Sequence, residues 1–429
     1  MPVWPKSFFT VGARILTART ARRLGRKKND VPAQNRVLHG LVARLATTSF
    51  WKGAGLEAGM GYAQFKSRVP VRKYEDFAPA IERMKAGEPN VLWPGQCGCF
   101  SVTPRGAASK APEPARFFPV TAEMREHFRE AAMESLFYYT ARTGNTRVFQ
   151  GRHLFLNGAN PVTPTTAGKP FETFAGNLRV AAASLPEAIQ KHFYEPGACL
   201  PQTSDWESNL DAIIKRTKPL NITLLAGIPS WLVRFADALR SQFGTSGESS
   251  FHLQKIWPNL DCVVHGGAPL APFAEELRRI LGPTVNFHEV YSASEAFIAA
   301  QDGEARSGLR LMAAAGIFYE FVPLEDFDEG RLANVGNKAV PFEDVRTGVD
   351  YAVLITTPGG LCRYIIGDVV RFVSTEPPRL QWIGRAGHQM TTFGERVTEK
   401  DLSDALITIC QRNTWTIVNF HVAPLVHDP

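Results

Sequence analysis

Residues 260–295, LDCVVHGGAPLAPFAEELRRILGPTVNFHEVYSASE, decide the fold. An apolar run is followed by the turn GGAP, then by a helical pattern whose apolar positions from Leu270 to Leu281 share one face, and then by a second strand, VNFHEVY. Residues 220–239, LNITLLAGIPSWLVRFADAL, repeat the order of strand, tight turn and helix. This alternation predicts an α/β domain with a largely parallel core sheet, in which ligands bind at the carboxyl ends of the strands.

The segments on either side of this core differ in character. Apolar residues spaced by three and four predict two amphipathic helices in the first 50 residues, and the stretch from Thr121 predicts a long helix with a good N-cap. Short strands joined by Gly, Pro or Asp turns predict a β-rich subdomain at about 310–384. We therefore expect a large N-terminal domain, residues 1–384, followed by part of a small α+β domain, residues 385–429.

The composition is that of a globular protein. The chain has 429 residues, of which 44% are apolar and 21% are charged, and its length predicts two or three domains. Its apolar runs fall far short of the roughly 18 to 20 residues of a membrane-spanning helix, and no early run looks like a secretory signal. Disordered, collagen-like and transmembrane classes are excluded, and a soluble protein is expected.

The six cysteines are sparse, and most of them lie within apolar runs. This pattern is typical of small buried side chains in a reducing compartment, so we expect a cytoplasmic protein. Cys97 and Cys99 form the one close pair in the sequence. Without a second pair or nearby histidines, they do not have the pattern of a zinc site.

Positive charge is concentrated at the start of the chain. The formal net charge is +7, and residues 1–40 contain nine basic residues against the single acid Asp30. A basic, aromatic-poor helix can bind nucleic acid or anionic lipid, and an Arg-rich start also resembles a transit peptide. The simpler interpretation is a solvated helix packed on a domain edge, and no nucleic-acid partner is expected.

Three strand ends collect polar side chains. The first is residues 291–295, YSASE, where a strand delivers an aromatic ring, hydroxyls and a carboxylate to one loop. The ring of Tyr291 can stack on a base, a hydroxyl can bind phosphate, and Glu295 can hold an Mg²⁺ ion that bridges phosphates. The alternative is an ordinary strand-end turn with an exposed glutamate.

The second strand end is residues 360–368, GLCRYIIGD, which we interpret as two strands that meet at a Gly-Asp turn. The carboxylate of Asp368 can accept hydrogen bonds from both hydroxyls of a ribose, although Gly-Asp is also a common hairpin turn. The third is Arg385, which follows a short strand and presents a planar set of donors. Each of these polar strand ends could arise by chance. All three in this order and spacing are much harder to attribute to chance.

Two further residues near strand ends have open interpretations. Trp231 starts the helix that follows the GIP turn, so it can line an acyl pocket or belong to the core. His265 immediately precedes two glycines, and we expect a strand-end core residue rather than a catalytic base.

The motifs resemble those of a known family. YSASE, GLCRYIIGDVVRF, WIGRAGHQMTTFGERV, VLWPG and FFPVTAEM look like the auxin-responsive promoter family of acyl acid amido synthetases, within the firefly-luciferase-like adenylate-forming superfamily. The similarity runs from about residue 35 to the C-terminus. It implies a two-step ligase: a carboxylic acid and Mg·ATP give an acyl-adenylate and pyrophosphate, and an amine, often an amino acid, then displaces AMP to give an amide.

The resemblance also implies roles for the residues that match the motifs. Tyr291 would lie against adenine, Ser294 would contact phosphate and Glu295 would help to hold Mg²⁺. Asp368 would bind the ribose hydroxyls, and Arg385 would bind the ribose–phosphate region. Glu295 and Arg385 are therefore the expected catalytic residues. The other implied nucleotide contacts are Tyr364 and the residues Gly266, Gly267 and Ala268 of the HGGAP turn.

Two segments depart from the family pattern. The family's phosphate loop, Ser-Ser-Gly-Thr-Thr-x-Gly-x-x-Lys, corresponds here to residues 103–116, which are longer, contain three prolines and place Arg116 where the lysine falls. Prolines remove N–H groups that such a loop uses to bind phosphate, but Thr103, Ser109 and Lys110 could still serve. The sequence after Arg385 is about half as long as the superfamily's mobile C-terminal lid.

These departures leave alternatives to a fully active amido synthetase. One is an impaired copy of that enzyme. A second is an acyl-CoA ligase, in which a thiol accepts the acyl group. A third is a protein that binds a nucleotide or an acyl acid without catalysis.

Overall fold

The structure of the chain is a computed structural model. It describes residues 6–25, 30–103, 115–156, 165–166, 169–175, 180, 184–185, 187–195, 206–243, 251–388, 390–392, 395–413 and 415.

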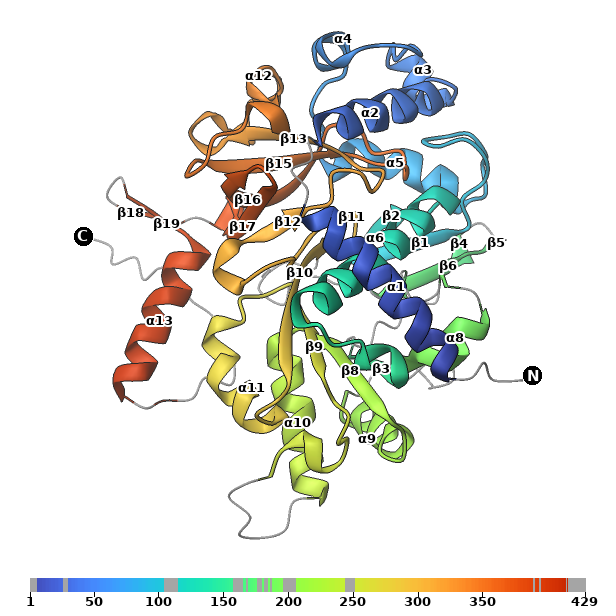
Figure 1. Cartoon of the computed structure of the whole chain (residues 1–429). Coiled ribbons are helices and arrows are strands. Elements are labelled where there is room, and N and C mark those ends of the chain that lie inside the picture. The colour runs from blue at the N-terminus through green and yellow to red at the C-terminus, as the bar shows by residue number, and fades with distance from the viewer. Residues whose placement is uncertain are drawn as a thin grey trace.

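Within these residues, twelve strands form one mixed sheet, with a smaller three-stranded sheet beside it (Figure 1). The strands of the large sheet, in spatial order, are β14 (Val340–Pro341), β13 (Phe318–Pro323), β15 (Asp350–Thr356), β16 (Tyr364–Thr375), β17 (Pro378–Arg385), β12 (Leu309–Leu311), β11 (Ala296–Ala300), β10 (Asn286–Ala293), β9 (Cys262–His265), β8 (Ile222–Gly227), β3 (Arg152–Leu156) and β7 (Tyr194–Glu195). The small sheet contains β2 (Arg116–Pro119), β1 (Cys99–Thr103) and β6 (Glu172–Ala175).

The large sheet has a parallel half and an antiparallel half. Strands β10, β9, β8, β3 and β7 pair in parallel, as the βα units at 220–239 and 260–295 predict. Strands β11 to β17 pair antiparallel and correspond to the predicted β-rich subdomain. The hairpin between β10 and β11 joins the two halves, so the β-rich part continues the same sheet.

Helices cover both faces of the sheet. The α-helices of more than four residues are α1 (Lys6–Leu24), α2 (Val31–Leu45), α3 (Ser49–Gly53), α4 (Tyr62–Arg68), α5 (Tyr74–Lys85), α6 (Ala122–Thr143), α8 (Glu187–Phe193), α9 (Trp206–Thr217), α10 (Pro229–Phe243), α11 (Ala274–Leu281), α12 (Leu332–Lys338) and α13 (Glu399–Asn413). They include the two N-terminal helices that the sequence predicts. None of the described helices combines the length and apolar character that a bilayer-spanning segment requires.

The parallel strands separate two apolar cores. Successive side chains of a strand point to opposite faces, so Leu224 and Ala226 of β8 face the core that contains α6, and Leu225 faces the core with α9, α10 and α11. Both faces of these strands are buried, which explains why their sequences are continuous apolar runs instead of alternating ones.

Helix α6 forms where the sequence predicts the long helix. The Thr121 side chain accepts a hydrogen bond from the backbone N–H of Met124, and Gly144, with φ of 69°, ends the helix in the left-handed conformation. The Thr121 hydroxyl also donates to the carbonyl of Pro358 at 2.8 Å. This N-cap thus ties α6 to the loop that precedes β16.

The predicted turn at Gly367-Asp368 is wrong. Strand β16 runs without interruption through both residues. Its register with β15 pairs Ile365 with Leu354 and Val369 with Ala352, so three residues of β16 face a single residue of β15. Gly367 has φ of 87°, and this bulge, not a hairpin turn, accounts for the glycine.

Candidate active site

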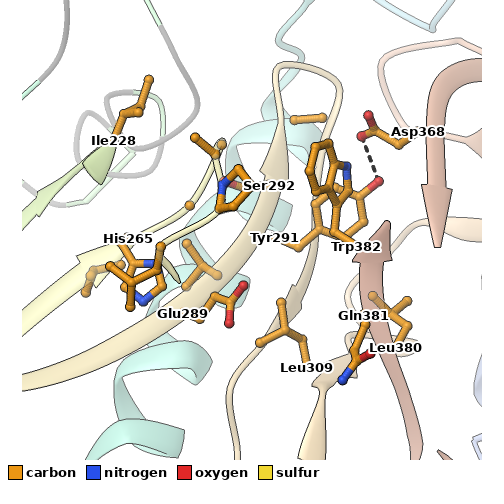
Figure 2. Close-up of a pocket in the computed structure, with 18 of the residues that line it drawn as sticks. Ile228, His265, Glu289, Tyr291, Ser292, Leu309, Asp368, Leu380, Gln381 and Trp382 are labelled. Carbon is orange, nitrogen blue, oxygen red and sulfur yellow. Dashed lines mark hydrogen bonds between the residues drawn. The ribbon is translucent and has the colours of Figure 1, made fainter. Parts of the chain in front are cut away.

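A cavity of about 1200 Å³ lies at the carboxyl ends of β8, β9 and β10, between the parallel half of the sheet and the ends of β16 and β17 (Figure 2). Pockets for single small molecules are typically about 300 to 1,000 Å³, so this cavity has room for two reactants side by side. Its position agrees with the expectation that ligands of a parallel sheet bind at the strands' carboxyl ends.

One wall of the cavity is a row of side chains from adjacent strands. Leu156, Gly227, His265 and Glu289 are in register across β3, β8, β9 and β10 and all line the cavity. Burial lowers the pKa of His265 to about 4, so this imidazole is neutral near pH 7, and burial raises the pKa of Glu289. His265 is a buried strand-end residue, as predicted, but it also borders the cavity. Sequence analysis missed Glu289, because it lies inside a strand pattern and only the register shows that it faces the cavity.

The HGGAP turn brings main chain close to the cavity. Gly266, Gly267 and Ala268 all line it, as the sequence predicts. A Cβ atom on Gly266 would lie 2.3 Å from the carbonyl oxygen of Val290, so no larger residue fits between β9 and β10 at this point. Gly267 has φ of 76°, in the region that favours glycine. A flat ligand can therefore approach the backbone of this turn directly.

Three of the predicted residues meet at the other side of the cavity. The Tyr291 hydroxyl donates a hydrogen bond to Oδ2 of Asp368 at 2.8 Å, drawn as a dashed line in Figure 2. Nε of Arg385 lies 3.5 Å from Oδ1 of the same carboxylate. Asp368 and Arg385 are cross-strand partners of β16 and β17, and the bulge at Gly367 lies next to Asp368. Burial and the neighbouring Asp368 charge raise the pKa of Tyr291, so its hydroxyl remains protonated and can donate.

Glu295 lies in the two-residue turn between β10 and β11. It is buried rather than exposed, which removes the simple alternative of a solvated strand-end glutamate. Burial, and to a smaller extent the charge of Asp368, raises the pKa of Glu295 to about 7, while a hydrogen bond from the Tyr364 hydroxyl at 3.2 Å opposes the rise. Tyr364 itself is buried behind Glu295 and is not part of the cavity wall, so it orients Glu295 from outside the cavity.

The small sheet also contributes to the cavity wall, with a hydroxyl from Thr103 of β1 and a guanidinium from Arg116 of β2. Oγ1 of Thr103 donates to Oγ of Ser294 at 2.9 Å, and both residues line the cavity. Thr103 and Arg116 are cross-strand partners of β1 and β2. The Arg116 guanidinium lies over the Tyr74 ring and 3.3 Å from Glu75. Ser109 and Lys110 lie outside the described residues.

The remaining walls come from two helices. Ile228 and Trp231, at the start of α10, form an apolar end together with Leu156 of the strand row, so Trp231 lines the cavity and its acyl-pocket interpretation stays available. Residues of α13, including Lys400 and Ser403, border the cavity near Arg385.

The arrangement suits a nucleotide with a bound cation. Glu295 is a buried carboxyl whose ionised form is disfavoured by burial and by Asp368, so a cation beside it would relieve a cost already present in the free protein. Asp368 offers a carboxylate beside the phenol ring of Tyr291, and Arg385 is half exposed and accessible to an anion. The predicted residues are therefore chemically compatible with a nucleotide and with a cation beside Glu295.

Two sequence profiles from one family match the chain. The profile described as "GH3 family N-terminal domain" matches residues 24–215, and the profile described as "GH3 family central domain" matches residues 310–385. Together they cover more than half of the sequence.

Individual proteins agree with this family match. Indole-3-acetic acid-amido synthetase GH3.8 of Oryza sativa subsp. indica is 21% identical over 429 residues, which cover 87% of this chain and 69% of that protein. Indole-3-acetic acid-amido synthetase GH3.15 of Arabidopsis thaliana is 23% identical, with coverage of 87% and 71%. The solved structure "AtGH3.15 acyl acid amido synthetase in complex with 2,4-DB" superposes with a TM-score of 0.70 at 17% identity and covers 98% of this chain and 78% of that one. A 2-hydroxyisobutyryl-CoA ligase in the postadenylation state gives a TM-score of 0.55 at 15% identity, with coverage of 88% and 71%. The chain therefore has the fold of adenylate-forming ligases.

Proposed function

The chain belongs to the GH3 family, and from that premise we propose that it is an ATP-dependent ligase that activates a carboxylic acid as an acyl-adenylate and transfers the acyl group to an amine, an amino acid, to form an amide. One observation carries the proposal. Tyr291 and Glu295 from one segment converge with Asp368 and Arg385, more than 70 residues later in the sequence, on one cavity that also has an apolar end. A nucleotide and an apolar acid can therefore bind side by side.

The roles of the nucleotide-binding residues follow from their contacts. Asp368 accepts hydrogen bonds from the ribose hydroxyls, and the Tyr291 hydroxyl fixes the orientation of that carboxylate while its ring faces the base. The backbone of the turn at Gly266 lies on the other side of the base, and glycine is required at this point because a Cβ would collide with the carbonyl oxygen of Val290. These contacts hold the nucleotide without a protein nucleophile, so catalysis depends on positioning.

The phosphate groups bind where donors and the metal ligand meet. The Ser294 hydroxyl, which accepts a hydrogen bond from Thr103, donates to a phosphate oxygen, Arg385 faces the α-phosphate, and Glu295 holds Mg²⁺. When bound, Mg²⁺ supplies positive charge that offsets the charge of the phosphates and of Glu295. Arg385 adds a second positive group beside the reacting phosphorus, and this group favours the transition state of the transfer.

The two steps balance without a further reagent. An oxygen of the substrate carboxylate attacks the α-phosphorus, the bond to the pyrophosphate oxygen breaks, and pyrophosphate leaves. The amine nitrogen then attacks the carbonyl carbon of the acyl-adenylate, the bond to the AMP oxygen breaks, and the nitrogen loses a proton. The apolar surface of Leu156, Ile228 and Trp231 holds the hydrocarbon part of the acid.

Helix α13 supports the proposal that residues 385–429 are part of a mobile lid. It borders the cavity through Lys400 and Ser403, and it follows the strand that ends at Arg385 after the two short strands β18 (Met390–Thr392) and β19 (Glu395–Val397). A rotation of this segment about the residues after β17 would change access to the phosphate region between the two steps. We place the enzyme in the cytoplasm, where ATP and amino acids are abundant.

A nucleotide titration tests the first part of the proposal. We expect Mg·ATP to bind the wild type in a calorimeter, and D368N to reduce its affinity by about tenfold or more, because a charged acceptor of the ribose hydroxyls is lost. D350N is the matched control, since Asp350 is a carboxylate on the neighbouring strand that pairs with Arg371 outside the cavity. Equal effects of the two variants, or no binding by folded wild type, would refute the nucleotide site.

Product analysis tests the second part. The protein is incubated with Mg·ATP, a panel of apolar carboxylic acids, the amino acids and coenzyme A together, and the products are identified by mass. An amide with release of pyrophosphate is the expected result. A thioester without amide would identify an acyl-CoA ligase, and nucleotide binding without any product would identify a non-catalytic protein.

A further inference from the structure

From Thr10 onward, where the structure describes its side chains, helix α1 packs on the domain by one face. Ala13 and Thr20 are buried, Oγ1 of Thr17 lies 2.8 Å from Oγ1 of Thr140 in α6, and Arg23 forms an ion pair with Glu134 of α6 at 2.7 Å. Figure 1 shows α1, in dark blue, lying across α6 on the outside of the molecule. The domain-edge helix that the sequence predicts is therefore present, and its opposite face is turned to solvent.

The solvent face of α1 exposes large apolar side chains. The exposed fractions are 57% for Val11, 51% for Ile15 and 42% for Leu16, and these three are half of the exposed large hydrophobic residues in the described part of the chain. At 3.6 residues per turn, Val11 and Ile15 lie within about 40° of each other around the helix axis. These two side chains form a short stripe that the fold leaves in contact with water, while Leu16 lies about 100° further around the helix.

Arginines surround this apolar stripe. Arg14 and Arg19 lie on its two sides, Arg22 lies on its line further along the helix, and all three are exposed. Helix α1 contains no acidic residue, and none of the ion pairs found among the described residues involves these three arginines. The face is therefore both apolar and strongly positive.

We propose that this face of α1 binds the surface of an anionic phospholipid bilayer, with Val11 and Ile15 among the headgroups and the arginines on lipid phosphates. An interfacial helix requires this combination, in which apolar side chains enter the boundary region and basic ones contact anionic headgroups. Nucleic acid would use the arginines but would leave the aliphatic stripe exposed. A second copy of this chain would cover the stripe but would bring like charges together.

Vesicle binding tests the proposal on the full-length protein. Co-sedimentation is measured with vesicles of phosphatidylcholine alone and with vesicles that also contain phosphatidylglycerol. We expect binding to the anionic vesicles that weakens as salt is added, and little binding to the neutral ones. Failure of the wild type to bind anionic vesicles at low salt would overturn the proposal. The measurement does not depend on ligase activity.

Matched variants distinguish a specific face from general basicity. R14Q with R19Q should lower the partition coefficient about 25-fold, since a basic residue near an anionic surface contributes about fivefold. R346Q with R412Q removes the same charge from exposed positions outside α1 and should change it much less. Equal losses from the two pairs would overturn the proposal. All these side chains are exposed, so the thermal midpoints should match that of the wild type.

Apolar variants test the second half of the proposal. V11S with I15S should weaken binding about tenfold, because part of the apolar area no longer leaves water. The control is I409S, which removes an aliphatic side chain of similar exposure from α13. Loss of binding to duplex DNA in the α1 variants, without loss on vesicles, would instead identify a nucleic-acid site. Concentration-dependent dimerisation that the α1 variants abolish would identify a second copy as the partner.

Discussion

Replacement of Glu295 by glutamine should stabilise the ligand-free protein at neutral and alkaline pH while it abolishes adenylation. The pKa of Glu295 is raised from its ordinary 4.5 to about 7, first by burial and then by the charge of Asp368. Proton binding therefore favours the folded state, and the contribution of this carboxyl to stability is greatest below pH 4.5 and decreases as the pH rises to about 7. At 1.36 kcal/mol per pKa unit, the whole loss is about 3 kcal/mol.

The glutamine variant keeps the shape and an acceptor for the Tyr364 hydroxyl, but it carries no charge at any pH. The free energy of unfolding of E295Q, minus that of the wild type, should therefore increase by about 2 to 3 kcal/mol between pH 5 and pH 8. Equilibrium urea unfolding at the two pH values measures it. E304Q, at an exposed position, is the matched control and should show no such trend. A difference for E295Q that is the same at both pH values would refute the reasoning.

The proposed metal-binding role of Glu295 predicts a second measurable effect of the same carboxyl, the release of protons when Mg·ATP binds. A cation beside the carboxyl favours the ionised form, so Mg·ATP binding at pH 7 should release about half a proton from the wild type. Calorimetry in buffers with different ionisation enthalpies measures this release. E295Q should release less, and equal release by both proteins would contradict the assignment of Glu295 as the metal ligand.

Two further predictions concern the segment that leads into β16. G360A should lower the free energy of unfolding by about 3 kcal/mol or more, because Gly360 has φ of 96° and a Cβ there would lie 2.5 Å from the backbone of Leu92. The control is G316A, which should lower it by only about 1 kcal/mol, because Gly316 has a similar φ of 88° but open space around it. Equal losses in urea unfolding would contradict this steric argument. R363M should lower the free energy of unfolding by about 3 to 5 kcal/mol, because it leaves Glu320 buried without its ion pair at 3.0 Å, and addition of E320Q should recover part of that loss. A double variant as unstable as the sum of its parts would show that the two side chains act independently.

Cavity-lining residues that occur as clusters at strand ends can be recognised from the sequence. Tyr291, Ser294 and Glu295 lie within five positions after an apolar run. The change from apolar to polar residues can be seen in the sequence without knowledge of the fold. Glu289 was missed because its neighbours in the sequence are strand residues with no special pattern. Its place in the site depends on its pairing with His265 on the adjacent strand, and pairing is a property of the sheet.

The Gly-Asp prediction failed for a different physical reason. A glycine with positive φ followed by an aspartate fits both a hairpin turn and a β-bulge, because both need the same local backbone conformation. The two differ in what lies across the sheet. Here Leu354 and Ala352 of β15 hold β16 on both sides of Gly367, so the strand continues and Asp368 turns toward Tyr291. Asp368 lines the cavity all the same, and its role in binding ribose stays a prediction.

Residues 360–368 both stabilise the fold and position side chains of the proposed site. Arg363, buried with φ of 46°, is fixed by the carboxylate of Glu320 and by three backbone carbonyls, and the next residue, Tyr364, donates to Glu295. Four residues later, after the bulge, Asp368 meets Tyr291. A shift of Arg363 would therefore move two groups of the proposed site. One is the Tyr364 phenol, which donates to Glu295, and the other is the Asp368 carboxylate. For this reason, R363M should weaken Mg·ATP binding even under conditions where the variant is fully folded, while D350N, on the neighbouring strand, should not.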